Sequence, residues 1–271
     1  MSSVTVPVAE SPTRALAPVV SARNLRVNYG AVRALDGVDF HVSPGEVVAL
    51  LGHSGSGKST LMKALTQMAP ATADELRIGD TDVLAQRGKD LRELRARVGN
   101  IFQHFNLVPN LSALSNVLTG GLYGAGPSNL VGLFPRRQRA RALELLDWVG
   151  LEDKARQQTR TLSGGQQQRV AIARALMQDP ELILADEPVA SLDPRLAGSV
   201  LALLRRIARE RDIPVIVSLH VVDLARRHAD RVIGLHSGLV LYEGPAADVD
   251  DDVVVAIYGE GGEFDDSDAG A

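Results

Sequence analysis

The sequence lacks cysteine and is poor in aromatic residues. With no cysteine among its 271 residues, it cannot form disulfides, thiolate zinc sites or cysteine-held iron–sulfur clusters, and it has no cysteine nucleophile. One Trp, four Tyr and five Phe are too few for a surface that stacks many nucleobases. Oxygen and nitrogen side chains are therefore the candidates for any catalytic or metal-binding role.

Basic residues are absent from the C-terminal end of the chain. The last of the 29 Lys and Arg residues is Arg231, whereas ten of the 33 Asp and Glu residues lie between Glu243 and the C-terminus. Residues 1–242 therefore carry a formal charge of +6, although the whole chain carries −4. Neither a mildly basic body nor an acidic end is by itself a nucleic-acid signature, and we expect no nucleic-acid partner.

The sequence also lacks a long hydrophobic run. Residues 98–135 contain no Asp, Glu, Lys or Arg, but Asn, Gln, His and Pro and a glycine-rich centre at residues 120–126 interrupt them. A bilayer span needs about 20 mostly apolar residues in succession, so no transmembrane segment is predicted. The N-terminus has no basic leader followed by an apolar run, so we expect no secretory signal and a cytoplasmic location.

The hydrophobic pattern predicts an α/β core that carries an inserted helical block. Residues 47–51 and 182–185 are continuously apolar, which is typical of strands buried on both faces, and residues 215–219 are interpreted as a third such strand. Alternating or strand-like patterns occur at residues 25–29, 38–42, 99–103 and 238–244. Helices are expected at residues 59–68, 136–149 and 166–178, with most of residues 106–180 helical.

This pattern predicts three regions along the chain. Residues 1–18 contain three prolines and no periodicity, so we expect a flexible leader. One folded domain is expected over residues 19–245, with its helical subdomain at about residues 104–180. Residues 246–271 are expected to form an acidic tail, whose end from Glu260 onward has the Asp-, Gly- and Ser-rich composition of disordered segments.

A complete P-loop follows the strand at residues 47–51. Its glycines let backbone N–H groups face phosphate oxygens, and the helix that follows favours negative charge at its N-terminus. Lys58 is expected to reach the β- and γ-phosphates of a nucleotide, and the hydroxyl of Ser59 to bind Mg²⁺. An empty glycine-rich turn is the alternative, which the strand–loop–helix context disfavours. The expected nucleotide-binding residues are Gly52, His53, Ser54, Gly55, Ser56, Gly57, Lys58, Ser59 and Thr60, with His53 acting only through its backbone.

Two acids end the apolar strand at residues 182–185. Asp186 is expected to hold Mg²⁺, directly or through water. Glu187 is expected to polarise an attacking water or accept its proton. Solvated acids at a strand end are the alternative, and the P-loop upstream favours the catalytic interpretation.

The pentapeptide Leu162-Ser163-Gly164-Gly165-Gln166 opens the helix expected at residues 166–178. A Ser with two glycines at a helix N-terminus is a potential anion site, and a simple helix cap by Ser163 is the alternative. This segment resembles the signature of nucleotide-binding subunits of ATP-binding cassette transporters. The resemblance implies a RecA-like P-loop NTPase core, an antiparallel β subdomain and an inserted helical signature subdomain.

Further positions are similar to the family's, in order along the chain. The resemblance implies that Tyr29 stacks on adenine, that Gln103 senses Mg²⁺ and takes part in catalysis, and that His220 contacts the γ-phosphate. It also implies that Ser163, Gly164, Gly165 and Gln166 contact the nucleotide on an opposite subunit, and that the loop at Asp193 crosses the interface between subunits. A surface tyrosine and a polar strand-end glutamine are the alternatives for Tyr29 and Gln103.

The ATP motifs do not encode a cargo, but five segments resemble the ATPases of phosphonate importers. They are residues 101–108, 130–136, 162–176, 185–194 and 218–225, and the ending at residues 257–259 is also similar. Val221 departs from that family, which often has Gln after the histidine. The resemblance implies an ATPase that drives uptake of phosphonates or a related phosphorus oxyanion.

Two other functions remain open. One is the same role for another cargo, such as phosphate, phosphite or an amino acid. The other is a cassette ATPase outside transport, which the single P-loop and the absence of a heptad run disfavour.

The importer resemblance implies specific partners and a location. It implies a homodimer on the cytoplasmic face of the membrane, with integral-membrane permease subunits and a periplasmic or lipid-anchored substrate-binding protein. The uncharged residues 98–135 then suit the permease contact, or simply the helical subdomain's own core.

Overall fold

A computed structural model describes residues 17–123 and 134–259. Most of the expected leader, residues 124–133 of the uncharged segment and residues 260–271 of the acidic tail lie outside this description. The disorder that composition predicts for the leader and the tail end is therefore not addressed by the structure. None of the helices within the described ranges combines the length and the apolar character needed to span a bilayer.

A six-stranded sheet forms the centre of the fold, in the order β11-β10-β3-β9-β8-β7. All neighbouring strands are parallel except the β10–β11 hairpin. The predicted central strands are confirmed, because residues 47–51, 182–185 and 215–218 all lie in this sheet. Its strands are β3 (Val47–Leu51), β7 (Val98–Phe102), β8 (Leu182–Asp186), β9 (Val215–Ser218), β10 (Arg231–His236) and β11 (Leu239–Pro245).

Successive side chains of β3 enter two different apolar cores, which explains why its sequence is apolar throughout. Val47, Ala49 and Leu51 pack in the core shared with the helical subdomain. Val48 and Leu50 pack in a second core, together with an antiparallel sheet. Since side chains alternate across a strand, a sheet covered on both faces requires continuous runs rather than alternation.

The antiparallel sheet covers one face of the parallel one. Its strand order is β2-β1-β5-β6, with β4 paired to β1. The alternation at residues 25–29 and 38–42 correctly predicts strands here, although both strands are longer than that. The strands are β1 (Val20–Tyr29), β2 (Val32–Val42), β4 (Ala71–Thr72), β5 (Glu75–Ile78) and β6 (Thr81–Asp82).

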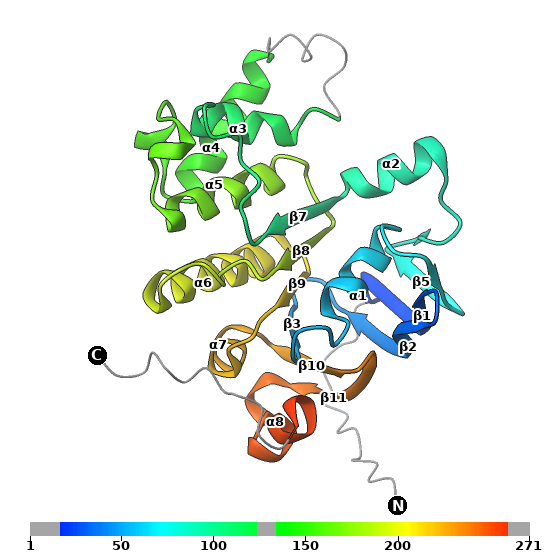
Figure 1. The fold of residues 1–271 in the computed structure, drawn as a ribbon. Helices are drawn as coiled ribbons and strands as arrows, with labels where there is room; N and C mark the ends of the chain where they lie inside the picture. The colour runs from blue at the N-terminus through cyan, green and yellow to red at the C-terminus, as the bar shows by residue number, and fades with distance from the viewer. Residues whose placement is uncertain (1–16, 124–133, 260–271) are drawn as a thin grey trace, which may run out of the picture.

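The helices divide between the core and a separate helical block. Figure 1 shows α3, α4 and α5 grouped on the side of the parallel sheet opposite β1 and β2. The predicted inward face of α4 is confirmed, because Ala142, Leu145 and Leu146 are all buried. The helices are α1 (Lys58–Leu65), α2 (Gly88–Ala96), α3 (Ala113–Gly120), α4 (Arg136–Trp148), α5 (Gly164–Leu176), α6 (Pro194–Arg211), α7 (Val222–His228) and α8 (Asp251–Tyr258).

Several helix boundaries differ from the sequence prediction. The helix expected to continue to residue 68 ends at Leu65, and Gln67 adopts the left-handed conformation with φ of 50°. The guanidinium of Arg95 donates hydrogen bonds to the carbonyls of Thr66 and Gln67, and so satisfies groups that another helical turn would have used. Helix α5 begins two residues early, because Ser163 caps it.

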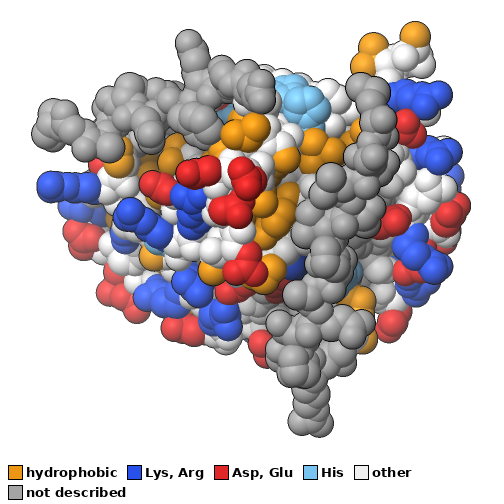
Figure 2. All heavy atoms as spheres, turned by 90° about the horizontal axis from the view of Figure 1, so that it is seen from below, with side chains coloured by type: hydrophobic (Ala, Val, Ile, Leu, Met, Phe, Trp, Pro, Cys, Tyr) orange, Lys and Arg blue, Asp and Glu red, His pale blue; other side chains and the backbone are white. Residues whose placement is uncertain are grey.

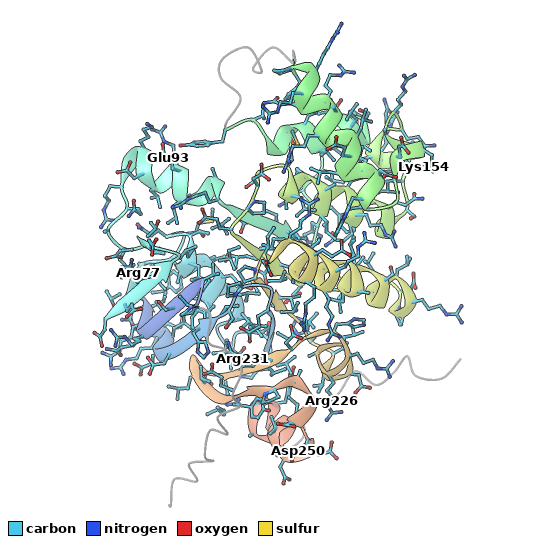
Figure 3. The ribbon with its side chains drawn as sticks, turned by 180° about the vertical axis from the view of Figure 1, so that it is seen from behind. Arg77, Glu93, Lys154, Arg226, Arg231 and Asp250 are labelled. Atoms are coloured by element: carbon cyan, nitrogen blue, oxygen red, sulfur yellow. The ribbon has the colours of Figure 1, made fainter. Side chains whose placement is uncertain are left out.

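The last basic residue, Arg231, joins the two sheets. It lies at the start of β10 (Figure 3), and its guanidinium contacts Glu46 at 2.7 Å, Glu243 on β11 and the carbonyl of His41 on β2. Its side chain is only 14% exposed, so this arginine lies in a largely enclosed site where unpaired charge is costly.

Elsewhere on the α8 side of the molecule, acidic and basic side chains intermingle (Figure 2).

The folded chain continues past the boundary expected at residue 245. Asp250 caps α8 by accepting a hydrogen bond from the Val253 N–H at 2.9 Å, and Asp251 and Asp252 occupy the first turn. Acids are favourable at a helix N-terminus, so this part of the acidic segment starts a helix rather than a tail. Val254 and Ile257 are buried against the core, which extends the domain to the end of α8.

Shortening Ile257 therefore tests whether α8 is part of the core. The side chain is 0% exposed and occupies the space left by Gly234, whose Cβ would collide with it. Ile257→Ala is expected to lower the free energy of unfolding by about 2–5 kcal/mol in denaturant titrations. Val255→Ala on the same helix is the control, because Val255 is 42% exposed; its effect should stay within about 0.5 kcal/mol. Equal, small effects of both would show that α8 does not stabilise the domain.

Candidate nucleotide-binding site

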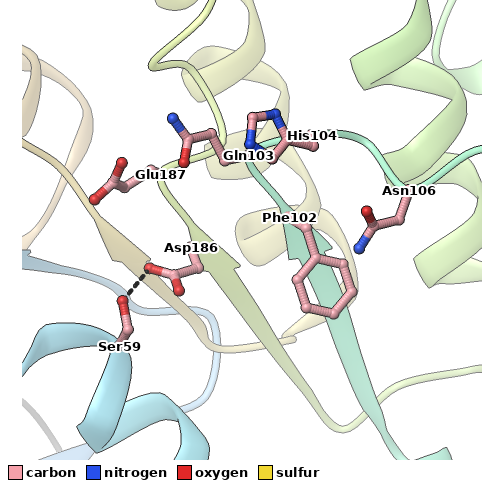
Figure 4. Close-up of a pocket in the computed structure, with 7 residues that line it drawn as sticks. All are labelled: Ser59, Phe102, Gln103, His104, Asn106, Asp186 and Glu187. Atoms are coloured by element: carbon pink, nitrogen blue, oxygen red, sulfur yellow. Dashed lines mark hydrogen bonds between the residues drawn. The ribbon is translucent and has the colours of Figure 1, made fainter.

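The predicted catalytic residues meet at the carboxyl ends of the parallel strands. Chains leaving neighbouring parallel strands converge at this edge, where α/β proteins commonly bind ligands. A cavity of about 250 Å³ lies there, beside the start of α1 (Figure 4). It is lined by Ser59, Phe102, Gln103, His104, Asn106, Asp186 and Glu187.

The P-loop connects β3 to α1 through backbone conformations that favour glycine. Gly52, Gly55 and Gly57 have φ of 146°, 81° and 113°, in the region where a Cβ is strained. A Cβ on Gly52 would also collide with the carbonyl of Leu235. Gly57 caps α1 without any side-chain bond, so the first N–H groups of this helix are available to an anion.

The Lys58 ammonium lies inside this loop. Its Nζ donates to the carbonyls of Gly52 at 2.5 Å and His53 at 3.1 Å, and the residue is only 5% exposed. Burial lowers the pKa of Lys58, while the nearby Glu187 and Asp186 act in the opposite direction and favour the charged form. In the fold, the buried Lys58 therefore lies near two acids, Glu187 and Asp186, at the position predicted for phosphate binding.

Asp186 joins α1 to two strands. Its Oδ1 accepts hydrogen bonds from Ser59 Oγ at 3.0 Å and from Ser218 Oγ at 2.8 Å. The predicted proximity of Ser59 and Asp186 is thus present in the structure. Ser218 was not singled out from the sequence; the only signal was a hydroxyl residue within an otherwise apolar strand.

Glu187 and His220 lie against each other. The Glu187 carboxylate accepts a hydrogen bond from His220 Nε2 at 2.6 Å. Glu187 also has φ of 48°, a left-handed conformation that is uncommon outside glycine. The two residues proposed for the water step and the γ-phosphate contact are therefore direct partners.

The C-terminal helix reaches the same site through Tyr258. Its hydroxyl accepts a hydrogen bond from the Gly52 N–H and donates one to the His220 carbonyl, each at 3.3 Å. Burial raises the pKa of Tyr258, and the bond from Gly52 acts in the opposite direction. Sequence analysis missed this residue because it assigned this segment to a tail.

The signature segment has a structural role within the chain. Ser163 and Gln166 form a reciprocal capping box at the start of α5, so the alternative of a helix cap is realised. Gly165 packs beside Leu196, where a Cβ would come within 3.1 Å. No hydrogen bond joins the described residues of the signature to those of the P-loop.

Three other predicted residues do not line the cavity. Tyr29 ends β1 and is 46% exposed, with its ring accessible. The His53 side chain turns to the Ser54 carbonyl at 2.6 Å and contacts the ring of His236, leaving its backbone at the loop as expected. Asp193 caps α6 by accepting bonds from the N–H groups of Arg195 and Leu196.

The donor set fits Mg²⁺ bound together with phosphates. Within residues 17–123 and 134–259, no group of three or more His, Asp or Glu residues is placed to hold a metal alone. Ser59 and Asp186 instead offer one hydroxyl and one carboxylate, and the Gln103 amide lines the same cavity. Mg²⁺ prefers such oxygen donors and commonly uses one or two protein ligands, with phosphates and waters completing its octahedron.

Comparison with known proteins agrees with this arrangement. The profile of the ABC transporter family matches residues 35–190. A relative from Frankia casuarinae named "Phosphonates import ATP-binding protein PhnC" is 52% identical over 231 residues, covering 84% of this chain and 91% of the relative. A "Phosphate-import ATP-binding protein PhnC" from Mycolicibacterium smegmatis is 50% identical over 247 residues, covering 89% and 92%.

Solved structures show the same fold. The ATP-binding cassette MJ0796, in a dimeric post-hydrolysis state with ADP and phosphate, has a TM-score of 0.72 and 35% sequence identity, covering 84% of this chain and 98% of that one. The predicted α/β fold is thereby confirmed. By its matched motifs, its fold and its relatives, the chain belongs to the ABC transporter family as an ATP-binding subunit.

Proposed function

We propose that this protein is the ATP-hydrolysing subunit of an importer for phosphonates or a related phosphorus oxyanion. The observation that carries the ATPase role is the meeting of Lys58, Ser59, Asp186, Glu187 and His220 at one strand edge. The cargo assignment rests on the names of relatives at 41–52% identity, most of them called phosphonate importers. One relative is named for phosphate import, which makes phosphate the second candidate.

Nucleotide binding uses the P-loop and Lys58. The uncapped N–H groups of α1 and the loop amides face the phosphates, and the ammonium exchanges its two loop carbonyls for β- and γ-phosphate oxygens. Ser59 and Asp186, with Gln103 beside them, hold Mg²⁺, which neutralises charge that develops on the phosphates. Tyr29 supplies an exposed ring against which adenine stacks.

Hydrolysis uses Glu187 and His220. The Glu187 carboxylate orients a water in line with the γ-phosphate and accepts its proton. In this structure His220 Nε2 donates to that carboxylate at 2.6 Å. To contact the γ-phosphate, the N–H exchanges the carboxylate for a phosphate oxygen, where a donor stabilises negative charge near the transferred group.

A second copy of the chain completes the site. Within the described residues no hydrogen bond joins the signature to the P-loop of the same chain, and the relative MJ0796 is described as dimeric with ADP and phosphate. In the homodimer, Ser163, Gly164, Gly165 and Gln166 of one copy contact the triphosphate on the other, next to the loop of Asp193. ATP then joins the copies, and hydrolysis separates them.

The uncharged segment provides the contact with membrane-embedded permease subunits on the cytoplasmic face. Part of it is core, since Ile101, Val117 and Leu118 are buried. Other large apolar residues of the same segment are exposed to between 38% and 52%, and we propose that the permease covers them; they are Phe102, Val108, Leu111, Leu122 and Tyr123. A substrate-binding protein outside the cell delivers the cargo.

Removing the Lys58 ammonium tests the P-loop assignment. Lys58→Ala is expected to weaken ATP binding at least tenfold and to abolish measurable turnover, because Lys58 is the one buried Lys or Arg of the loop among the described residues. Lys63→Ala on the exposed side of the same helix is the matched control and should bind and hydrolyse ATP like the parent chain. Calorimetric ATP titration and phosphate release provide the measurements, and full activity of Lys58→Ala would overturn the assignment.

Growth and uptake test the cargo. A strain without this gene and without other importers for phosphorus oxyanions is expected not to grow on methylphosphonate as the sole phosphorus source. The parent gene should restore growth and uptake of labelled phosphonate, and the Lys58→Ala gene should not. Normal phosphonate uptake in the deletion strain, with a selective loss of phosphate uptake, would replace phosphonate by phosphate as the cargo.

A further inference from the structure

Ser218 connects both catalytic acids through a single hydroxyl. It is the last residue of β9 and is 0% exposed. Its Oγ donates to Asp186 Oδ1 at 2.8 Å and accepts the N–H of Glu187, also at 2.8 Å. The Ser218 hydroxyl thus donates to one residue at the end of β8 and accepts from the next. Because both bonds are made, the orientation of the buried hydroxyl is fixed.

The first of these bonds orients the Asp186 carboxylate. Oδ1 receives the hydroxyls of Ser59 and Ser218, whereas Oδ2 accepts no hydrogen bond within the described part of the chain. Figure 4 shows this carboxylate between Ser59 and the cavity. Two donors on one oxygen fix the rotation of the side chain and leave the other oxygen for a ligand.

The second bond holds the backbone of Glu187. Its φ of 48° is a conformation that surrounding structure must stabilise in a residue with a Cβ. The N–H bond to Ser218 fixes this backbone, and His220 Nε2 holds the side-chain carboxylate at 2.6 Å. His220 lies two residues beyond Ser218, the end of β9, and the two residues together hold Glu187 at its backbone N–H and its carboxylate.

We propose that Ser218 is a positioning residue for ATP hydrolysis, which sets the Asp186 carboxylate and the Glu187 backbone in their working geometry. This role rests on the proposed ATPase function. It requires no contact between Ser218 and the nucleotide. The competing explanation is that a serine simply fills a small buried space, in which case an alanine would serve equally well.

Ser218→Ala distinguishes the two explanations. Loss of a hydrogen bond to a charged group is expected to lower kcat about tenfold or more, while nucleotide binding without Mg²⁺ stays unchanged because the P-loop is intact. The readout besides activity is ADP affinity by calorimetry, in Mg²⁺ and in EDTA. The ratio of ADP affinity in Mg²⁺ to ADP affinity in EDTA should be several-fold smaller in Ser218→Ala than in the parent chain. The ADP affinity in EDTA should be the same for both.

Two further variants control for structural effects. Val217→Ala also removes buried atoms from β9, since Val217 is 1% exposed, but it breaks no side-chain hydrogen bond; it should lower the melting temperature without changing the Mg²⁺ dependence. Ser218→Thr keeps the hydroxyl and should restore most of kcat. Parent-like kcat and Mg²⁺ dependence in Ser218→Ala would overturn the positioning role, as would the same losses in Val217→Ala. A parent chain without ATPase activity would instead overturn the proposed function, and this role with it.

Discussion

Asp186 Oδ1 accepts hydrogen bonds from two hydroxyl groups, and through them one carboxylate joins the start of α1 to the ends of β8 and β9. Helix α1 begins with the buried Lys58, and the residues after β8 and β9 include Glu187 and His220. This one carboxylate therefore links the elements that carry Lys58, Glu187 and His220. Backbone pairing in the sheet fixes the register of the strands. The hydrogen bonds from Ser59 and Ser218 fix the Asp186 side chain at their ends.

The charge arrangement favours an anionic ligand. Burial lowers the pKa of Lys58, and its neighbours Glu187 and Asp186 act in the opposite direction and favour the charged form of its amine. The same two acids would repel a triphosphate unless the ammonium, the helix N-terminus and Mg²⁺ offset them. The site thus combines a preformed cation with acids that need a metal, which is the balance that phosphoryl transfer requires. Because Gly57 gives α1 no side-chain cap, its N–H groups remain available to the phosphates.

The sequence predicted the parts of the fold that local chemistry determines. Continuous apolar runs identified β3 and β8, because both faces of the parallel sheet are covered, and the glycine pattern of the P-loop predicted its backbone. Contacts between distant segments were not predictable in this way. Ser218 lies 32 residues from Asp186, and Tyr258 lies 206 residues from Gly52; neither has a local pattern that indicates its partner. The acids at the start of α8 were interpreted as part of a tail. Their composition matches both a disordered end and the first turn of a helix. The burial of Ile257 in the core distinguishes the helix from the disordered end.

The central claim is that ATP binds in a site shared by two copies of the chain, with Glu187 as the base. Light scattering of the Glu187→Gln variant, with Mg²⁺ and ATP, with Mg²⁺ and ADP, and without nucleotide, tests it most directly. This change keeps the size of the side chain and its hydrogen bond but removes the base, and loss of a general base typically lowers turnover about 10²–10⁴-fold. The account predicts a mass twice that of the monomer with Mg²⁺ and ATP, and the mass of the monomer in the other two conditions. It also predicts slow phosphate release. A monomer at saturating ATP, or phosphate release at the parent rate, would contradict it.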